Sequence, residues 1–156
     1  MDLFGASRTQ SLDRKSYAFV IVDNYLRFTW NIFLASKNKT FIELSKFAKC
    51  VQNKKGYTIV KIRYHNGGKF SNESFIKFYN DNGLEHSFSA SRTPQQNGVV
   101  ERKNRYIQKM ARTMFNEHSL PKYFWAEAVN TACYVLNIVS LRPILKITPH
   151  ELWKDR

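Results

Sequence analysis

A continuous apolar run from Tyr17 to Asp23 (YAFVIVD) constrains the fold of this chain more than any other feature. Such a run, dense in β-forming residues, is typical of a strand that is buried on both faces of a sheet. Asn24 and Tyr25 make a short polar break. The next eight residues, Arg27 to Leu34 (RFTWNIFL), then have the composition of a second strand. The two segments therefore predict a hairpin inside a sheet.

Helical and strand patterns alternate along the rest of the chain. Apolar residues recur every three or four positions from Thr40 to Asn53, and Gly56 follows as a stop signal. Asn72 is placed to cap a short helix that Gly83 ends. The remaining segments are a strand at 57–64, a strand at 84–88, a polar loop at 89–98, helices at 99–117 and 120–139, and a capping box at 148–151. This order predicts a mixed α/β sheet with helices packed on it.

The charge of the chain indicates the class of its partner. Its 156 residues include 25 Lys and Arg against 12 Asp and Glu, a formal net charge of +13. So large a surplus is typical of a domain that binds a polyanion, most often nucleic acid, although an anionic membrane surface also fits. No apolar stretch reaches the roughly 18 to 20 residues that span a bilayer. Residues 1–16 also lack the apolar segment of a signal peptide. We expect an intracellular protein, or a piece of a longer one.

Cysteine and histidine indicate no structural metal site. Cys50 and Cys133 are far apart and lie in apolar helical patterns, so both are expected to be buried free thiols. The histidines lack the spacing of zinc ligands.

Three carboxylates at predicted strand ends or helix starts are candidates for chemistry: Asp2, Asp23 and Glu101. Asp23 is better explained as the cap of a hairpin turn, and Glu101 in a first helical turn is also favourable through the helix dipole. One helical face continues from Glu101 through positions +4, +7 and +11, which are Arg105, Gln108 and Arg112. This face could hold a metal ion and phosphates, or it could simply contain an intrahelical Glu–Arg pair.

The loop before this helix resembles a known family. Residues 93–105 (TPQQNGVVERKNR) closely resemble the TPxxNGxVER segment of retroelement integrases, most of all the version in copia-type retrotransposons. Further segments resemble the same family in the same order: MDLFG at the start, VIVDxYxRFTW at 20–30, NGGxF at 66–70, MARTM at 110–114, LPKYFWAEAVNTACYVLN at 120–137 and TPxELW at 148–153. The resemblance covers essentially the whole chain. The loop also argues against a different ribonuclease H-like nuclease.

The resemblance implies a ribonuclease H-like α/β fold, in which helices flank a five-stranded mixed sheet. It implies an Asp-Asp-Glu (DDE) triad that binds two divalent ions, Mg²⁺ or Mn²⁺, which prefer oxygen ligands. One ion activates the attacking hydroxyl and the other stabilises the leaving oxygen. The implied reactions are the trimming of the element's DNA ends and their joining to target DNA. They are carried out in the nucleus by a homo-oligomer, with no membrane and no small-molecule substrate.

The site residues follow from the resemblance by position. Asp2 and Glu101 match two members of the triad and are the implied catalytic and metal-binding residues. The implied contacts to DNA are Asn97, Arg102, Arg105, Gln108 and Arg112. At two of these positions, Arg105 and Gln108, related integrases have DNA-contacting lysines. Arg105 keeps the charge, whereas Gln108 weakens the second contact.

The second triad position departs from the family. His65 stands where the family has aspartate, and Tyr64 and Lys69 replace the usual serine and glutamate. A neutral imidazole lacks the negative charge that divalent ions need, although it can ligate Mn²⁺. We expect a fold that persists and a catalytic activity that is severely impaired or lost. The alternative is a non-catalytic nucleic-acid-binding remnant of a decayed retroelement.

The chain is expected to be one integrase core fragment, residues 1–156. Roughly residues 1–118 would form the ribonuclease H-like sheet and helices, and residues 119–156 the C-terminal helices. The chain starts abruptly at Met1, so we expect the first strand to be truncated at its N-terminal end. This would expose unpaired backbone groups and lower the stability.

Overall fold

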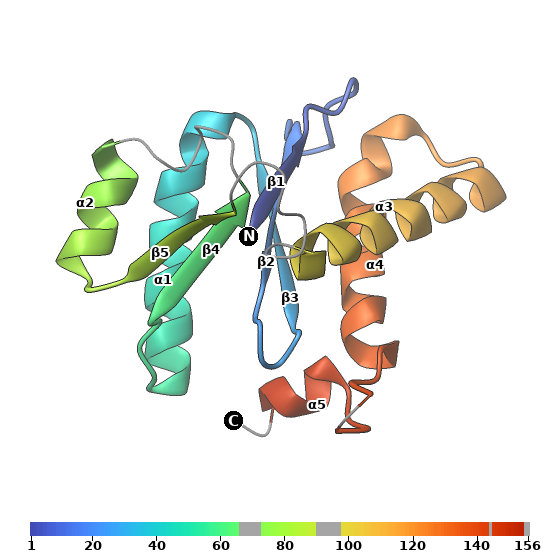
Figure 1. Cartoon of the computed structure of the whole chain (residues 1–156). Coiled ribbons are helices and arrows are strands. Elements are labelled where there is room, and N and C mark those ends of the chain that lie inside the picture. Colours follow the sequence, from blue (N-terminus) through green and yellow to red (C-terminus); the bar gives the residue numbers. More distant parts are fainter. Residues whose placement is uncertain (66–72, 90–97, 144, 155–156) are drawn as a thin grey trace.

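The computed structural model describes residues 1–65, 73–89, 98–143 and 145–154. Its first three strands form an antiparallel sheet in chain order (Figure 1): β1 (Asp2–Gly5), β2 (Tyr17–Val22) and β3 (Thr29–Leu34). The register pairs Val20 of β2 with Asp2 on one side, and Ile21 of β2 with Trp30 on the other. The predicted hairpin is therefore confirmed.

The turn of this hairpin is held by the Asp23 side chain. Its Oδ1 accepts hydrogen bonds from the backbone N–H groups of Tyr25 (2.8 Å) and Leu26 (2.6 Å). Arg27 then has a left-handed φ of 61°, which a strand residue does not adopt, so β3 begins at Thr29 rather than at Arg27. The interpretation of Asp23 as a turn cap is confirmed.

The other two strands form a separate sheet, which corrects part of the fold prediction. β4 (Lys61–His65) and β5 (Glu85–Ser89) pair in parallel, and α2 (Glu73–Asp81) lies between them in the chain. Between β1 and β4, the amino group of Met1 donates a 2.7 Å hydrogen bond to the carbonyl oxygen of Arg63. A ladder needs such bonds repeated along both strands. The four-residue β1 forms a ladder with β2 but only this bond to β4 is seen in the described residues. The expected five-stranded sheet is therefore divided into a sheet of three strands and a sheet of two.

The segment before β4 is held by a helix instead of by a strand. A strand was predicted from Tyr57, but the backbone N–H of Ile59 bonds to Oε1 of Gln52 at 2.8 Å. Gln52 belongs to α1 (Thr40–Lys55), which ends at Gly56 in a left-handed conformation (φ 69°) as predicted. This side-chain contact ties Ile59 to the helix, and the ladder with β5 starts at Lys61.

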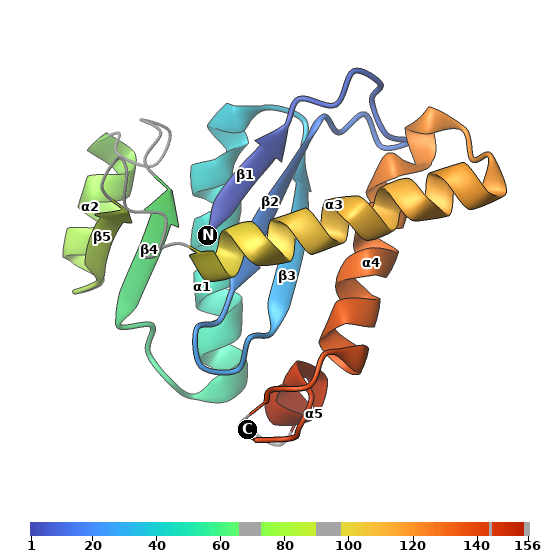
Figure 2. The same cartoon turned by 45° about the vertical axis from the view of Figure 1, so that its right-hand side comes forward.

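Helices cover both faces of the three-stranded sheet (Figure 2). On β2, the side chain of Phe19 packs with α1 and α2, while Ala18 and Val20 pack against α3 and α4. The strand is therefore buried on both faces, as its apolar run predicted. The helices on the second face are α3 (Gly98–His118) and α4 (Trp125–Val139). The shorter helical elements of the described residues are α5 (Pro149–Lys154) and the 3₁₀ turns η1 (Lys37–Lys39) and η3 (Lys122–Phe124).

Two buried side chains of α4 bond to the start of the edge strand β3. Oδ1 of Asn137 accepts a hydrogen bond from the backbone N–H of Thr29 (2.9 Å), and its Nδ2 donates to the carbonyl oxygen of Thr29 (2.8 Å). The Cys133 thiol also donates to that carbonyl, at 3.3 Å. Asn137 thus takes the place of a neighbouring strand at the start of β3. Further on, the predicted capping box of Thr148 and Glu151 is confirmed by their reciprocal hydrogen bonds.

The two cysteines differ in exposure, which corrects the expectation that both are buried. Cys133 is buried under β3, and this burial raises the pKa of its thiol to about 12. Cys50 is exposed, because it lies on the side of α1 away from the buried residues Leu44 and Ala48. None of the helices in the described part of the chain has both the length and the apolar character needed to cross a bilayer.

Candidate active site and nucleic-acid interface

The carboxylate of Asp2 is held between β1 and α3. Its Oδ2 accepts a 2.7 Å hydrogen bond from Nδ2 of Asn104, and its Oδ1 accepts a 2.8 Å bond from the backbone N–H of Leu3. Asn104 is only 4% exposed and lies on the buried stripe of α3 that also carries Val100 and Ile107. The first strand and the long helix are therefore locked together at the predicted site.

Asp2 and Glu101 line one surface hollow of about 630 Å³. Apart from Asp2, the hollow is lined entirely by one face of α3: Glu101, Asn104, Arg105, Gln108, Lys109, Arg112, Thr113 and Asn116. The structure thus brings together five of the residues predicted from the sequence: Asp2, Glu101, Arg105, Gln108 and Arg112. The two carboxylates are far apart in the sequence, and the packing of α3 on the sheet, with the Asn104–Asp2 hydrogen bond, brings them to one hollow.

The sequence prediction missed four residues of the hollow, which are Asn104, Lys109, Thr113 and Asn116. Asn104 holds Asp2, and Lys109 adds a third cation beside Arg105 and Arg112. Lys109 could have been found from its position, because it lies four residues after Arg105 and so on the same helical face. Asn104 gave no such signal, since a polar residue on an apolar stripe has many explanations.

The charges of the hollow are separated along the helix. The carboxylates lie at the start of α3, and the cations follow over its next three turns. From Glu101 to Arg112 the helix rises about 16 Å. The cations provide N–H donors suited to phosphate oxygens, so one end of the hollow has the chemistry of a cation site and the other that of a phosphate-binding surface.

Arg102 does not line this hollow. It lies within electrostatic reach of Arg27, at the turn between β2 and β3. Burial lowers the pKa of the Arg27 guanidinium, and repulsion from Arg142 and Arg102 lowers it further. Lys103 lies near Cys133 of α4, and its pKa is lowered by burial. Arg102 and Lys103 therefore lie on a different side of α3 from the hollow.

Two further positions were predicted, Asn97 and His65. Asn97 lies outside the described residues. The backbone of His65 ends β4 opposite Ser89, and the Met1–Arg63 hydrogen bond brings this end of β4 beside the start of β1. The side chain of His65 lies outside the described part of the chain.

The donor atoms suit a divalent cation in kind but not in number. Asp2 and Glu101 offer carboxylate oxygens, the ligands that Mg²⁺ and Mn²⁺ prefer. Oδ1 of buried Asn104 has no hydrogen-bond donor among the described residues. However, the described residues contain no group of three or more His, Cys, Asp or Glu that could hold a metal ion. Within the described residues, the site therefore offers a cation the two carboxylates of Asp2 and Glu101.

Comparisons with known proteins agree with the fold and with the predicted family. No family model matches the chain. It is 32% identical over 155 residues to the retrovirus-related Pol polyprotein from transposon TNT 1-94 of Nicotiana tabacum, which covers 99% of this chain and 12% of that polyprotein. A similar polyprotein from transposon RE2 of Arabidopsis thaliana is 32% identical over 127 residues, or 81% of this chain and 9% of the polyprotein. The chain thus spans only a small part of its relatives.

Among solved structures, the catalytic core domain of HTLV-2 integrase in complex with magnesium is similar to this chain. The TM-score is 0.64 at 20% identity, over 96% of this chain and 93% of that one. The fold is therefore that of the ribonuclease H-like integrase catalytic cores. The polyprotein relatives show that the chain belongs to the copia-type retrotransposon Pol polyproteins, and the part of them that it matches has the fold of integrase catalytic cores.

Proposed function

We propose that this chain is the catalytic core of a retrotransposon integrase, which processes DNA 3′ ends and joins them to target DNA, and that this copy is catalytically impaired. The observation that carries the proposal is the single hollow in which Asp2 and Glu101 meet the cations Arg105, Lys109 and Arg112. Carboxylates next to a row of phosphate-binding groups suit phosphoryl transfer on a nucleic acid.

The residues of the hollow divide the work between them. Asp2 and Glu101 would hold divalent cations, which supply activation of the attacking oxygen and stabilisation of the leaving oxygen when they are bound. Asn104 keeps the Asp2 carboxylate in place through its 2.7 Å hydrogen bond. Arg105, Lys109 and Arg112 bind the phosphates of the DNA strand and so bring the scissile bond to the carboxylates.

The impairment follows from His65. A neutral imidazole in place of the second aspartate removes one negative charge from the site. A pair of unit charges about 4 Å apart is worth roughly 4 kcal/mol at an effective dielectric constant of 20. Loss of half to all of this energy from the transition state lowers the rate by roughly 30- to 1000-fold. Weaker retention of the cations would add to that loss.

A strand-transfer or disintegration assay on branched DNA tests the proposal. We expect His65→Asp to raise the rate by roughly 30- to 1000-fold with Mg²⁺. The gain should disappear when Asp2→Asn is added. The matched control is His118→Asp, the same substitution at an exposed position at the end of α3, and it should leave the rate unchanged. Robust Mg²⁺-dependent activity of the unmodified chain would refute the impairment.

The second candidate function is non-catalytic binding of nucleic acid. It is favoured by the cationic end of the hollow, where Arg105, Lys109 and Arg112 lie. It predicts salt-dependent DNA binding with no activity in either the unmodified chain or His65→Asp. A homo-oligomer is part of both proposals, and it is supported by the dimeric and trimeric forms of the HTLV-2 integrase core.

A further inference from the structure

Four cations from three separate segments of the chain come together outside the hollow. Arg27 lies in the connection between β2 and β3, Arg102 and Lys103 lie near the start of α3, and Arg142 follows α4. Arg27 is within electrostatic reach of the other three. We call these four residues the cationic cluster. The family resemblance implies a role for Arg102 alone, so it is the tertiary structure that assembles the cluster.

Arg142 is fixed at the cationic cluster by both its backbone and its side chain. Its backbone N–H donates to the carbonyl oxygen of Ile147 (3.0 Å), and its own carbonyl oxygen accepts from the N–H of Lys146 (2.8 Å). The guanidinium donates from Nη1 to the carbonyl oxygen of Tyr25 and lies 5.8 Å from the centre of the Tyr25 ring. Tyr25 and Arg27 belong to the same turn, so these contacts bring Arg142 to Arg27.

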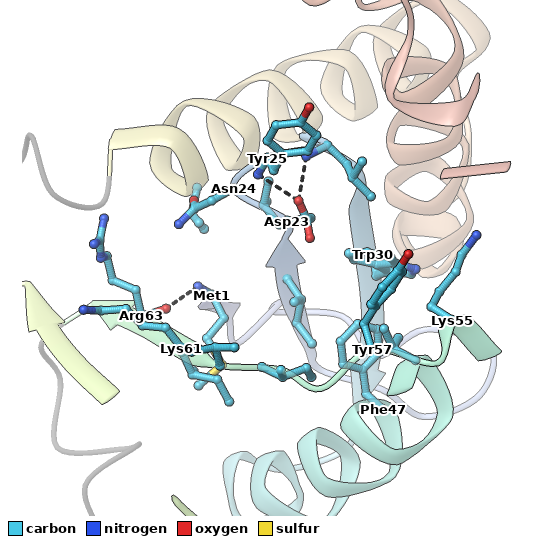
Figure 3. Close-up of a pocket in the computed structure, with 18 of the residues that line it drawn as sticks. Met1, Asp23, Asn24, Tyr25, Trp30, Phe47, Lys55, Tyr57, Lys61 and Arg63 are labelled. Carbon is cyan, nitrogen blue, oxygen red and sulfur yellow. Dashed lines mark hydrogen bonds between the residues drawn. The ribbon is translucent and has the colours of Figure 1, made fainter. Parts of the chain in front are cut away.

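Asp23 does not neutralise the cationic cluster. Its Oδ1 accepts the two backbone N–H bonds that hold the turn, as Figure 3 shows. The attraction of Asp23 raises the pKa of Arg27 less than the repulsion from Arg142, or that from Arg102, lowers it. None of the ion pairs between described residues involves a cluster residue. The cluster therefore carries a net positive charge that an anion from outside the chain could balance.

The turn itself does not explain an arginine at position 27. Arg27 has a φ of 61°, in the left-handed region that glycine and asparagine adopt more readily than other residues. Its backbone N–H bonds to the carbonyl oxygen of Asp23 at 2.9 Å, a bond that any residue except proline can make. The guanidinium of Arg27 therefore lies beside other cations at a position where glycine would suit the backbone better. A role for the side chain accounts for this residue.

An exposed aromatic ring lies beside these cations. Tyr25 is 54% exposed. The turn also borders a pocket of about 460 Å³ (Figure 3), but no residue of the cationic cluster lines that pocket or the hollow. Cations beside an exposed aromatic ring suit single-stranded nucleic acid, because a base stacks on the ring while the backbone follows the charges. A duplex keeps its bases stacked on each other, so a single strand is the better ligand.

We propose that the cationic cluster and Tyr25 bind a single-stranded segment of nucleic acid, with its phosphates on the arginines and one base on the tyrosine ring. Guanidinium groups suit this role because they remain charged and form paired hydrogen bonds with phosphate oxygens. The inference rests on the proposed function only in taking nucleic acid as the polyanion, since the hollow is not part of this site.

The salt dependence of binding to a ten-nucleotide single strand tests the phosphate contacts. Each contact contributes about 0.7 to the slope of the logarithm of the binding constant against that of the salt concentration. Arg27→Asn with Arg102→Gln should therefore make the slope shallower by about 1.4. Lys46→Gln with Lys49→Gln removes the same charge from exposed positions on α1 and should leave it unchanged. Equal slopes for the two double variants would overturn the proposal.

Unfolding does not account for the expected loss. Asparagine tolerates the left-handed conformation of residue 27, and the double variant also removes repulsion between Arg27 and Arg102. Its melting temperature should therefore equal or exceed that of the unmodified chain.

Tyr25→Leu tests the stacked base. Leucine keeps an apolar side chain and the backbone carbonyl to which Arg142 donates. The affinity for the single strand should fall at least about fivefold with an unchanged salt slope, and the affinity for a ten-base-pair duplex should stay within about twofold. Tyr134→Leu, at a 61% exposed position on α4, should change none of these quantities. Equal losses for single strand and duplex would refute the stacking.

Two further measurements separate this inference from its alternatives. Inorganic tripolyphosphate that bound as tightly as the single strand, and no less tightly to Tyr25→Leu, would assign the site to free polyphosphate, and the proposed partner would be wrong. Arg105→Gln with Arg112→Gln changes the hollow alone. Unchanged duplex binding by that variant would count against the proposed function and leave the cationic cluster intact, whereas failure of the cluster variants would leave the hollow intact.

Discussion

The double hydrogen bond between Asn137 and Thr29 predicts a large loss of stability from one small substitution. Asn137→Ala removes the acceptor of the Thr29 N–H (2.9 Å) and the donor to its carbonyl oxygen (2.8 Å). Thr29 is 2% exposed, so water cannot replace these partners. An unsatisfied buried N–H costs about 1–3 kcal/mol. The Thr29 carbonyl oxygen keeps the Cys133 thiol as a partner, so losing its bond from Asn137 costs less. For the two lost bonds together, we expect the free energy of unfolding to fall by about 2–4 kcal/mol.

Urea unfolding followed by circular dichroism measures this loss. The midpoint should fall with an unchanged dependence on denaturant, because the same surface is exposed on unfolding. The melting temperature should fall by about 5–15 °C. Asn130→Ala is the matched control on the same helix, since Asn130 makes an exposed 3.2 Å bond to Asn31 and should cost less than about 0.5 kcal/mol. A loss for Asn137→Ala no larger than that of the control would refute the reasoning.

Two further predictions concern the thiols and the hollow. In the native chain at about pH 8, iodoacetamide should modify exposed Cys50 and spare Cys133, because burial raises the pKa of the Cys133 thiol to about 12 and keeps it protonated. Mass spectrometry counts the adducts, and two adducts on the folded chain would contradict the burial. The logarithm of the observed binding constant Kobs for duplex DNA falls with the logarithm of the salt concentration, and Lys109→Ala should make this negative slope shallower by about 0.9. Lys46→Ala, whose lysine pairs with Glu43 at 2.8 Å on α1, should leave it unchanged, and equal slopes for both variants would exclude Lys109 from the interface.

Most local structure could be predicted from residue patterns. The apolar run of β2, the Gly56 stop and the Thr148–Glu151 capping box all appear where the patterns indicated them. These features depend on contacts between residues only a few positions apart, which periodicity and turn chemistry describe. The errors lie at boundaries where a side chain competes with the ladder. Gln52 holds Ile59 out of β4, and the left-handed Arg27 delays the start of β3.

The candidate site, too, was predicted only in part from the sequence. The resemblance to integrases identified Asp2 and Glu101 by position, and the helical period placed Arg105, Gln108 and Arg112 on one face. What the period did not indicate was Asn104, whose role depends on a partner 102 residues away. A buried asparagine on an apolar stripe shows no preferred partner in sequence, since nothing local specifies which chain segment will pack opposite it.

The sequence by itself determined the order of the elements, their amphipathic faces and the family. The tertiary structure alone decided how they pair. In the described part of the chain it divides the strands between two sheets, and it joins Asn137 to Thr29 across 108 residues. The physical reason is the distance along the chain over which each kind of interaction acts. Periodicity records which face of an element is buried, whereas hydrogen bonds between distant segments depend on the relative placement of whole helices and strands, which only the packed chain fixes.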